Sequence, residues 1–379
     1  MEYKEYELDE LLPYEQPQAY IVESTDYSDS YKTPVLTAGK SFILGYTNET
    51  DGIFDELPVI IFDDFTTATQ FVNFKFKVKS SAMKILHINT DLVVPRYIYY
   101  RLQTIHVDHS THKRYWIQQF SKIKVRIPPI PVQQRIVSHI EELFSSLDNA
   151  VETLQKTKEQ LAVYRQAVLE TCIGKGEAKT ILECVENMGQ GWSPKCIRTP
   201  VLNDEEWAVI TTTAVQPMQF LYEENKKLPE TLEARPKHEL NVGDILITRA
   251  GPRFRCGICC MVKKTKKKLM NCDKVYRLIV KKEFILPEYF EAVLNSPAFQ
   301  KEIAFCKTGG NDSGVNLTQD RFLNIKIPVP EISTQMKILS DIASRVSVCD
   351  SIEQTVNTAL AQAEAMRQSI LKEAFEGRL

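Results

Sequence analysis

A segment of this chain occurs twice, at positions far apart in the sequence. Residues 120–171, beginning FSKIKVRIPPIPVQQRIVSHI, align without a gap onto residues 322–373, beginning FLNIKIPVPEISTQMKILSDI, at a constant shift of 202 (322 minus 120). Residues that recur unchanged include, in the first copy, Phe120, Ile123, Lys124, Pro128, Ile130, Gln133, Ile136, Ser138, Ile140, Asp148, Arg165, Gln166 and Leu169. Because a long ungapped repeat indicates two copies of one structural unit, the sequence predicts pseudo-two-fold symmetry.

Both copies carry apolar residues at the alternating spacing of three and four that is typical of a helix packed on another helix. In the first copy these positions are Ile140, Leu143, Leu147, Ala150, Leu154, Thr157, Leu161, Tyr164 and Val168, and the helix is expected to end near Gly174 and Gly176. The second copy has Ile342, Arg345, Cys349, Ile352, Val356, Ala359, Ala363, Met366 and Ile370. We expect an antiparallel intramolecular coiled coil with main contacts at Leu143, Leu147, Leu154, Leu161, Ile352, Val356, Met366 and Ile370. The alternative is that each helix packs only on its own domain.

The segments that precede the two repeat copies lack helical periodicity over most of their length. Their strand candidates are residues 59–62, 74–78, 207–212, 244–248 and 275–280, which are bounded by turn-forming residues. A proline-led helical stretch comes near the end of each segment, at residues 95–102 and 287–294. We therefore expect an α+β protein. Two globular α/β domains, at residues 1–127 and 177–329, are separated by two long antiparallel helices, at residues 128–176 and 330–379.

Length and composition narrow the class of protein. A chain of 379 residues can hold two domains with their own cores. It has no apolar run of membrane length, and its acidic N-terminus MEYKEYELDE is unlike a signal or transit peptide, so we expect a cytoplasmic protein. Nine cysteines, an odd number without a secretory signal, favour free thiols. The net charge of −2 argues against a uniformly basic nucleic-acid binder but permits local basic surfaces.

Cations cluster at several places in the two globular segments. Phosphate groups bind cations, and an arginine in a constrained loop can also recognise a guanine edge through two hydrogen bonds. The candidate DNA contacts are Lys77, Lys79, Lys84, Lys113, Arg114, Arg249, Arg253, Arg255, Lys263, Lys264, Lys307 and Asn311. A solvated surface or hairpin tip explains the lysine run at 263–268 equally well. The arginines of 249–255 are better candidates because they follow a predicted strand.

Motifs for catalysis are missing from the sequence. An adenine methyltransferase needs a cofactor loop and an Asn/Asp-Pro-Pro-aromatic motif, whereas Pro128 and Pro129 lie between isoleucines. The sequence also contains no Gly-x-x-x-x-Gly-Lys-Ser/Thr phosphate loop. We therefore expect no catalytic residue on this chain.

Two weaker patterns point to metal binding. Thiolates at the spacing of Cys256, Cys259 and Cys260, with Cys272 nearby in sequence, can ligate zinc, but residue alternation around them suits a buried strand equally well. Asp204 and Glu224 have only a faint nuclease-like spacing. We expect no metal site.

Several stretches resemble the specificity subunits of type I restriction-modification systems. They are IPPIPVQQRIVSHIEEL, its second copy IPVPEISTQMKILSDI, the helix endings RQAVLETCIGKG and RQSILKEAFEGRL, and the segment GDILITRAG. The resemblance spans nearly the whole chain. It implies two target recognition domains, each reading one half of a bipartite DNA site, and helices that dock two modification subunits.

The resemblance also implies where the chemistry lies. The modification subunits would carry S-adenosylmethionine and methylate adenine, and restriction subunits would add ATP- and Mg-dependent translocation and cleavage. No cofactor is expected on this chain. One alternative is a system in which modification and cleavage share another chain, and a second is an enzyme that itself acts on nucleic acid.

Overall fold

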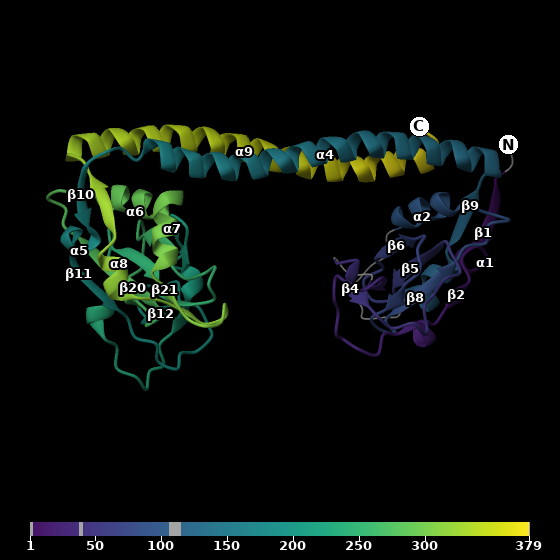
Figure 1. Cartoon of the computed structure of the whole chain (residues 1–379). Coiled ribbons are helices and arrows are strands. Elements are labelled where there is room, and N and C mark those ends of the chain that lie inside the picture. The colour runs from purple at the N-terminus through teal and green to yellow at the C-terminus, as the bar shows by residue number, and fades with distance from the viewer. Residues whose placement is uncertain (1–2, 38–40, 106–114, 379) are drawn as a thin grey trace. The chain divides into compact units, whose positions relative to one another are not determined.

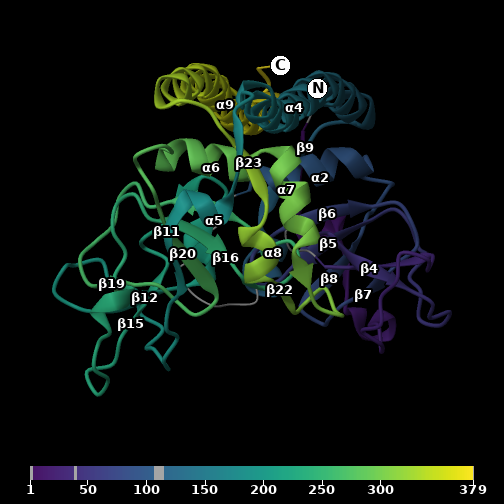
Figure 2. The ribbon, with the colours of Figure 1, turned by 60° about the vertical axis from the view of Figure 1, so that its left-hand side comes forward.

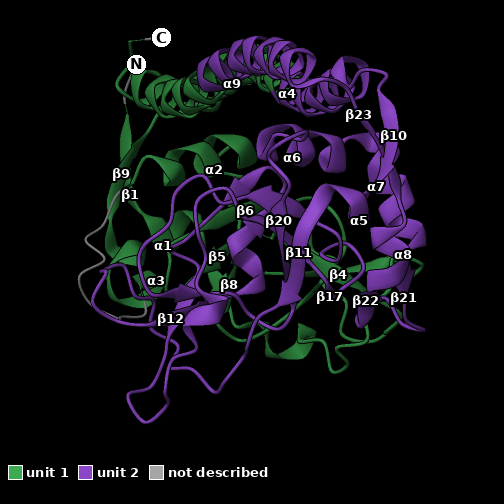
Figure 3. Cartoon of the chain, turned by 90° about the vertical axis from the view of Figure 1, so that its left-hand side faces the viewer, with its two compact units in different colours: residues 1–154, 357–379 green, residues 155–356 purple. Residues whose placement is uncertain are grey.

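Two long helices, α4 (Ile130–Cys172) and α9 (Ile332–Phe375), lie side by side in the computed structural model (Figure 1). The structure describes residues 3–37, 41–105 and 115–378. The chain divides into two compact units: unit 1 comprises residues 1–154 and 357–379, and unit 2 comprises residues 155–356 (Figure 3). Each long helix therefore contributes one part to each unit. This arrangement confirms two α/β domains joined by two packed helices.

Unit 1 is built around an antiparallel sheet with the strand order β2-β8-β5-β6 and a smaller sheet with the order β4-β3-β7. Its strands are β1 (Lys4–Glu7), β2 (Tyr14–Glu15), β3 (Thr33–Leu36), β4 (Ile43–Thr47), β5 (Val59–Asp63), β6 (Thr69–Val72), β7 (Lys77–Val78), β8 (Met83–His87) and β9 (Lys124–Ile127). Its shorter helices are α1 (Leu8–Leu11), α2 (Pro95–Gln103) and α3 (Tyr115–Gln118), with 3-10 turns η1 (Pro17–Tyr20) and η2 (Phe120–Lys122). Along β5, Ile60 and Phe62 enter one apolar cluster and Val59 and Ile61 the other, because successive side chains point to opposite faces. Both faces of this sheet are therefore covered.

Unit 2 likewise contains a four-stranded sheet and a three-stranded sheet, together with additional short strands. The main sheet has the antiparallel order β11-β20-β16-β18, and a second sheet has the order β15-β12-β19. The strands are β10 (Glu177–Thr180), β11 (Val185–Gln190), β12 (Ala208–Ile210), β13 (Val215–Gln216), β14 (Gln219–Phe220), β15 (Asn225–Lys227), β16 (Ile245–Thr248), β17 (Ala250–Gly251), β18 (Cys259–Met261), β19 (Leu269–Met270), β20 (Val275–Val280), β21 (Lys307–Thr308), β22 (Val315–Leu317) and β23 (Lys326–Val329). The helices are α5 (Ile181–Cys184), α6 (Pro287–Asn295), α7 (Pro297–Phe305) and α8 (Gln319–Leu323), with 3-10 turns η3 (Thr212–Ala214) and η4 (Pro236–His238). Figure 2 shows α6 lying between this sheet and α9.

The two long helices pack in an antiparallel arrangement. In unit 1, Arg367 of α9 pairs with Asp148 of α4, and in unit 2, Arg165 of α4 pairs with Asp350 of α9 at 2.7 Å. The second pair is the first with the helices exchanged, because 148 plus 202 is 350 and 165 plus 202 is 367. None of the helices in the described ranges is both long and apolar enough to cross a membrane.

The helix seam differs from its prediction at some of the alternate apolar positions. The residues at intervals of seven are buried or half-buried as expected: Ile140, Leu147, Leu154, Leu161 and Val168 in α4, and Ile342, Cys349, Val356, Ala363 and Ile370 in α9. Leu143 is half-buried. Ile352 and Met366, however, are 40% and 55% exposed, so their assignment to the seam was wrong. Their places are taken by Glu353 and Arg367, half-buried polar residues that an apolar pattern cannot identify.

A buried glutamine near the start of each long helix bonds that helix to its domain. Gln133 accepts a hydrogen bond from Val94 N at 2.7 Å and donates to Leu92 O at 3.1 Å and Pro128 O at 2.8 Å. Val94 is the residue before α2, so the glutamine joins α4 to α2. Its side chain is completely buried.

Gln335 repeats these bonds in unit 2. It accepts from Leu286 N at 2.9 Å and donates to Phe284 O and Pro330 O, both at 2.7 Å. Leu286 precedes α6, as Val94 precedes α2. The two glutamines are related by the shift of 202 (335 minus 133), so each copy of the repeat is attached to its domain in the same way.

Candidate nucleic-acid interface

A groove of about 440 Å³ lies in unit 2 beside the sheet β15-β12-β19. It is lined by the segment 193–198 that connects β11 to β12 and by the segment 272–274 before β20, which are hydrogen-bonded to each other through Ser193 and Asp273. Strand pairing places Lys226 of β15 opposite Val209 of β12, and both line the groove. The floor is thus formed by strands, which hold the lining residues in fixed positions.

Cations dominate the rim of this groove. They are Lys195, Arg198, Lys226 and Lys274, all exposed, and none forms an ion pair with another residue in the described ranges. Asp273 is the one acidic residue that lines the groove, and it is hydrogen-bonded to Ser193. Unpaired cations around a concave surface attract polyanions, and phosphate groups are their common ligand in nucleic acids.

Two of the predicted arginines connect the groove to the loop between β17 and β18. Arg249 donates from Nε to Asp273 O at 2.8 Å, and its guanidinium lies 5.6 Å from the centre of the Tyr276 ring. Arg255 donates to Thr212 O at 2.7 Å, Val215 O at 2.8 Å and Gln216 Oε1 at 3.1 Å. Because these bonds occupy its guanidinium, we reassign Arg255 from ligand contact to bracing of the loop.

The remaining predicted contacts of this region surround the same loop. Arg253 is exposed and pairs with Asp312 at 2.6 Å, and Lys307 donates to Arg253 O at 3.3 Å. Burial, together with the charge of Arg253, lowers the pKa of Lys307. Asn311 is exposed in the neighbouring loop. Arg253 and Lys307 thus lie together at this loop, and Asn311 directly precedes the Asp312 that Arg253 binds.

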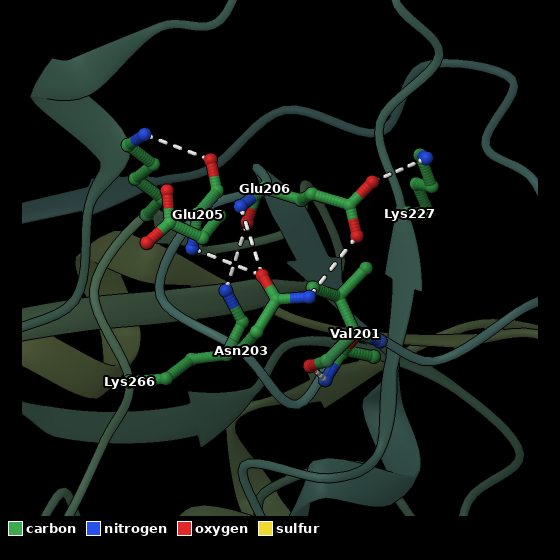
Figure 4. A network of polar contacts seen from close by, with 8 residues as sticks. Val201, Asn203, Glu205, Glu206, Lys227 and Lys266 are labelled. Carbon is green, nitrogen blue, oxygen red and sulfur yellow. Dashed lines mark hydrogen bonds and ion pairs between the residues drawn. The ribbon is translucent and has the colours of Figure 1, made fainter.

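Most lysines of the run at 263–268 bind other groups of the protein. Lys266 is 5% exposed and donates to Glu206 O at 2.9 Å, within a network that also contains Asn203 and Lys227 (Figure 4). Lys263 pairs with the buried carboxylate of Glu291 at 3.1 Å. Lys264 is exposed, with its ammonium 5.5 Å from the centre of the Tyr222 ring. Of the two predicted contacts in this run, Lys264 is the better candidate for binding a ligand, because its ammonium lies near a ring whereas that of Lys263 is paired with a carboxylate.

The lysines of unit 1 divide into buried and exposed groups. Lys84 is 2% exposed and pairs with the equally buried Asp64 at 3.3 Å, while Lys77 pairs with Glu49 at 3.0 Å and donates to Asp51 O at 2.6 Å. Because both ammonium groups are enclosed by protein, their prediction as DNA contacts was wrong.

Lys79 is exposed and remains a candidate, with its ammonium 5.8 Å from the centre of the Tyr27 ring. Two further predicted contacts, Lys113 and Arg114, lie outside the residues that the structure describes. Among the residues that the structure describes, unit 1 thus keeps one of the predicted contacts as a candidate.

The cysteine pattern belongs to the core of unit 2. Cys256 and Cys259 enter the apolar cluster of the main sheet, whereas Cys260 and Cys272 enter the cluster on its other face. Burial raises the pKa of Cys272 to about 11. In the part of the chain that the structure describes, no three His, Cys, Asp or Glu side chains are grouped so that they could hold a metal ion.

The groove cations were missed by sequence reasoning because they are far apart in the chain. Lys195 and Arg198 lie some thirty residues before Lys226 and almost eighty before Lys274. Only the pairing of β12 with β15 and the return of the chain before β20 bring them together. A run of cations is visible in sequence, whereas a site assembled by strand order is not.

Comparisons with known proteins agree on one family. The family model described as "Type I restriction modification DNA specificity domain" matches residues 1–162 and 197–362. The chain is 32% identical over 377 residues to the type I restriction enzyme EcoR124I/EcoR124II specificity subunit of Escherichia coli, covering 92% of this chain and 87% of that protein. It is 25% identical over 278 residues to the EcoKI specificity subunit of E. coli strain K12, covering 69% and 58% of the two chains.

The fold is also found in a solved structure. A chain from a structural study of complex assembly and conformational transition of the type I restriction-modification system has a TM-score of 0.67 at 14% identity, covering 100% of this chain and 98% of that one. These matches define a class of DNA-specificity proteins that are not themselves enzymes. The chain belongs to the type I restriction-modification specificity subunits.

Proposed function

We propose that this subunit reads a bipartite DNA target with two recognition domains, residues 1–127 and 177–329. In this proposal the helices at residues 128–176 and 330–379 set the separation of the domains and dock two methyltransferase subunits. The observation that carries the proposal is the duplicated attachment through Gln133 and Gln335, which bond in the same way to different domains. A duplicated frame with divergent domains suits a target with two different halves.

The symmetry of the helix pair supports two docking faces. Tyr164 of α4 and Met366 of α9 are related by the shift of 202 and are 47% and 55% exposed. Exposed apolar side chains at equivalent positions suit a partner that binds twice. S-adenosylmethionine would then be bound by the methyltransferase subunits, and ATP and Mg by restriction subunits, in the cytoplasm where the target DNA is found. A partner chain that combines modification and cleavage would use the same two faces.

The stoichiometry is tested by light scattering. The subunit is mixed with a saturating amount of its methyltransferase, and the mass of the complex is measured. We expect two methyltransferase chains per subunit, since the docking faces are equivalent. A stable one-to-one complex at saturation would contradict the proposal.

The groove is tested by the salt dependence of DNA binding. Lys274 precedes β20 and lines the groove, whereas Lys282 follows the same strand at its other end and is also exposed. Changing Lys274 to Ala is expected to weaken binding by the complex and to lower the slope of log K against log salt by about 1, because one phosphate contact is lost. Changing Lys282 to Ala should leave the slope unchanged. Equal slopes for both variants would remove the groove from the interface.

A further inference from the structure

An aromatic ring is displayed to solvent at the loop between β17 and β18. Phe254 is 79% exposed, more than any other large apolar side chain in the described ranges, and it contributes to neither of the apolar clusters of unit 2. Single exposed apolar residues are common on protein surfaces, so exposure alone assigns no role. Three further observations distinguish this ring.

First, the turn that carries the ring is held in place. Pro252 O accepts hydrogen bonds from Arg255 N at 2.8 Å and Cys256 N at 3.1 Å, and Arg253 N donates to Asp312 O at 2.8 Å. The guanidinium of Arg255 anchors the same turn to the backbone of residues 212–216. The ring is therefore presented from a rigid support and needs no ordering when a ligand binds.

Second, the chain closes tightly behind the turn. Gly257 has φ +87°, and a Cβ at this position would lie 2.6 Å from Ile303 Cγ2. Only glycine fits this close approach of the loop to α7 without strain. This close contact fixes the position of the turn against α7.

Third, two cations adjoin the turn that carries the ring. Arg253 and Lys307 adjoin the turn, and Arg249 bonds the end of β16 to Asp273 in the groove wall. Arg255 bonds the turn to Thr212, which lines the same groove. The turn that carries the ring is thus flanked by two cations and is bonded to a residue that lines the groove.

We propose that Phe254 is a DNA-inserting wedge. In the complex it enters a base step of the half-site read by unit 2 and partly unstacks it, while Arg253 neutralises a neighbouring phosphate. Apolar side chains inserted between base pairs unstack and kink duplex DNA, and cations beside them bind the backbone. Unstacking also lowers the cost of extruding the adenine that a methyltransferase must take out of the duplex. This inference rests on the proposed function.

The experiment uses the complex of the full chain with its methyltransferase subunits. The target is first found by sequencing modified adenines in cells that express the wild-type complex. Duplexes with 2-aminopurine at each position of that target then report unstacking through fluorescence, and titration gives the affinity. The variants are Phe254→Ala, Phe254→Leu, and the control Phe305→Ala, which removes a ring that is 77% exposed and faces a different pocket with Asn324 and Lys326.

We expect Phe254→Ala to weaken binding to target DNA about 10- to 100-fold, the range found when one stacked aromatic residue is removed. The fluorescence increase at one base step should disappear. Methylation should also fall, and the change in the methylated sequences should be confined to one half-site. Phe254→Leu should keep most of the fluorescence, because an aliphatic wedge also separates bases. Phe305→Ala should behave as wild type.

The two proposals fail in different ways. If the wild-type complex binds its target specifically but Phe254→Ala keeps full affinity and fluorescence, the wedge is refuted and the proposed function stands. An equal loss in Phe305→Ala would also refute the wedge, because the effect would then belong to surface rings in general. If the wild-type complex shows no sequence preference, the proposed function fails and the wedge with it. Phe254 is exposed, so unchanged urea unfolding of the variant confirms that folding is not the cause.

Discussion

The buried glutamine of each long helix should be essential to the stability of its own unit. Replacing Gln133 with Met keeps the volume of the side chain but removes all three of its hydrogen bonds to the backbone. Val94 N–H and the carbonyls of Leu92 and Pro128 are then enclosed without this partner. At about 1 kcal/mol or more for each unpaired buried group, the unfolding free energy of unit 1 should fall by roughly 3 kcal/mol.

The assay is urea unfolding of the whole chain, followed by probes in each unit. For a slope of about 2 kcal/mol per molar urea, the midpoint of unit 1 should move down by about 1.5 M while that of unit 2 changes little. Gln335→Met should give the mirror result, with the shift confined to unit 2. Gln134, the exposed neighbour of Gln133, provides the matched control, because Gln134→Met changes the same residue type on the same helix without removing these bonds.

This reasoning predicts a difference between two adjacent glutamines of identical chemistry. If Gln133→Met and Gln134→Met shift the midpoint equally, the hydrogen bonds contribute nothing measurable and the effect belongs to helix propensity. If Gln133→Met unfolds both units together, the units are not energetically separate. Either outcome would refute the argument that each glutamine joins one helix to one domain.

Three further changes have defined expectations. Lys84→Met should destabilise unit 1 by about 3 kcal/mol or more in urea unfolding, because Asp64 is left buried without its cation, and adding Asp64→Asn should recover part of that loss; no loss would show that the ion pair is dispensable. Burial raises the pKa of Glu291, so the folded state binds its proton more tightly than the unfolded state, and stability contributed by this group should fall as pH rises from the ordinary glutamate value toward the raised one. Unfolding over a pH series should therefore show a weaker decline for Glu291→Gln, and identical pH profiles would contradict this assignment. Seven residues inserted into both α4 and α9 keep the heptad register and add about 10 Å, so methylome sequencing should find a gap between half-sites longer by about 3 base pairs, and an unchanged gap would show that the helices do not set it.

Sequence predicted those parts of the fold that depend on local pattern. The apolar runs at 59–62 and 275–280 form β5 and β20, and the proline-led stretches form α2 and α6. The repeat also predicted the antiparallel helices. These predictions were correct because hydrophobic periodicity and the position of proline determine the structure of the same segment in which they occur.

The failures have a common physical origin in partners that lie far away in sequence. Lys84 appeared as a surface cation because its partner Asp64 is brought to it by strand pairing and not by sequence proximity. The seam positions of Glu353 and Arg367 are polar, and each forms an ion pair with the opposite helix: Glu353 with Arg165 at 2.8 Å, and Arg367 with Asp148. A search for apolar residues therefore selects the adjacent residues Ile352 and Met366 instead.

Residues that recur at the shift of 202 and residues outside the repeat have different roles. Residues repeated at the shift of 202, such as Gln133 and Gln335, attach a domain to a helix or, like Arg165 and Arg367, a helix to its partner. Phe254 lies outside the repeat, and so do the cations of the groove. Under the proposed function, the repeated residues present equivalent surfaces to two equivalent partner subunits and are therefore the same in both copies, whereas a surface that reads bases differs between the two half-sites. Substitutions in the repeated set should therefore alter assembly and stability in matched pairs, and substitutions in the unrepeated set should alter the recognition of one half-site at a time.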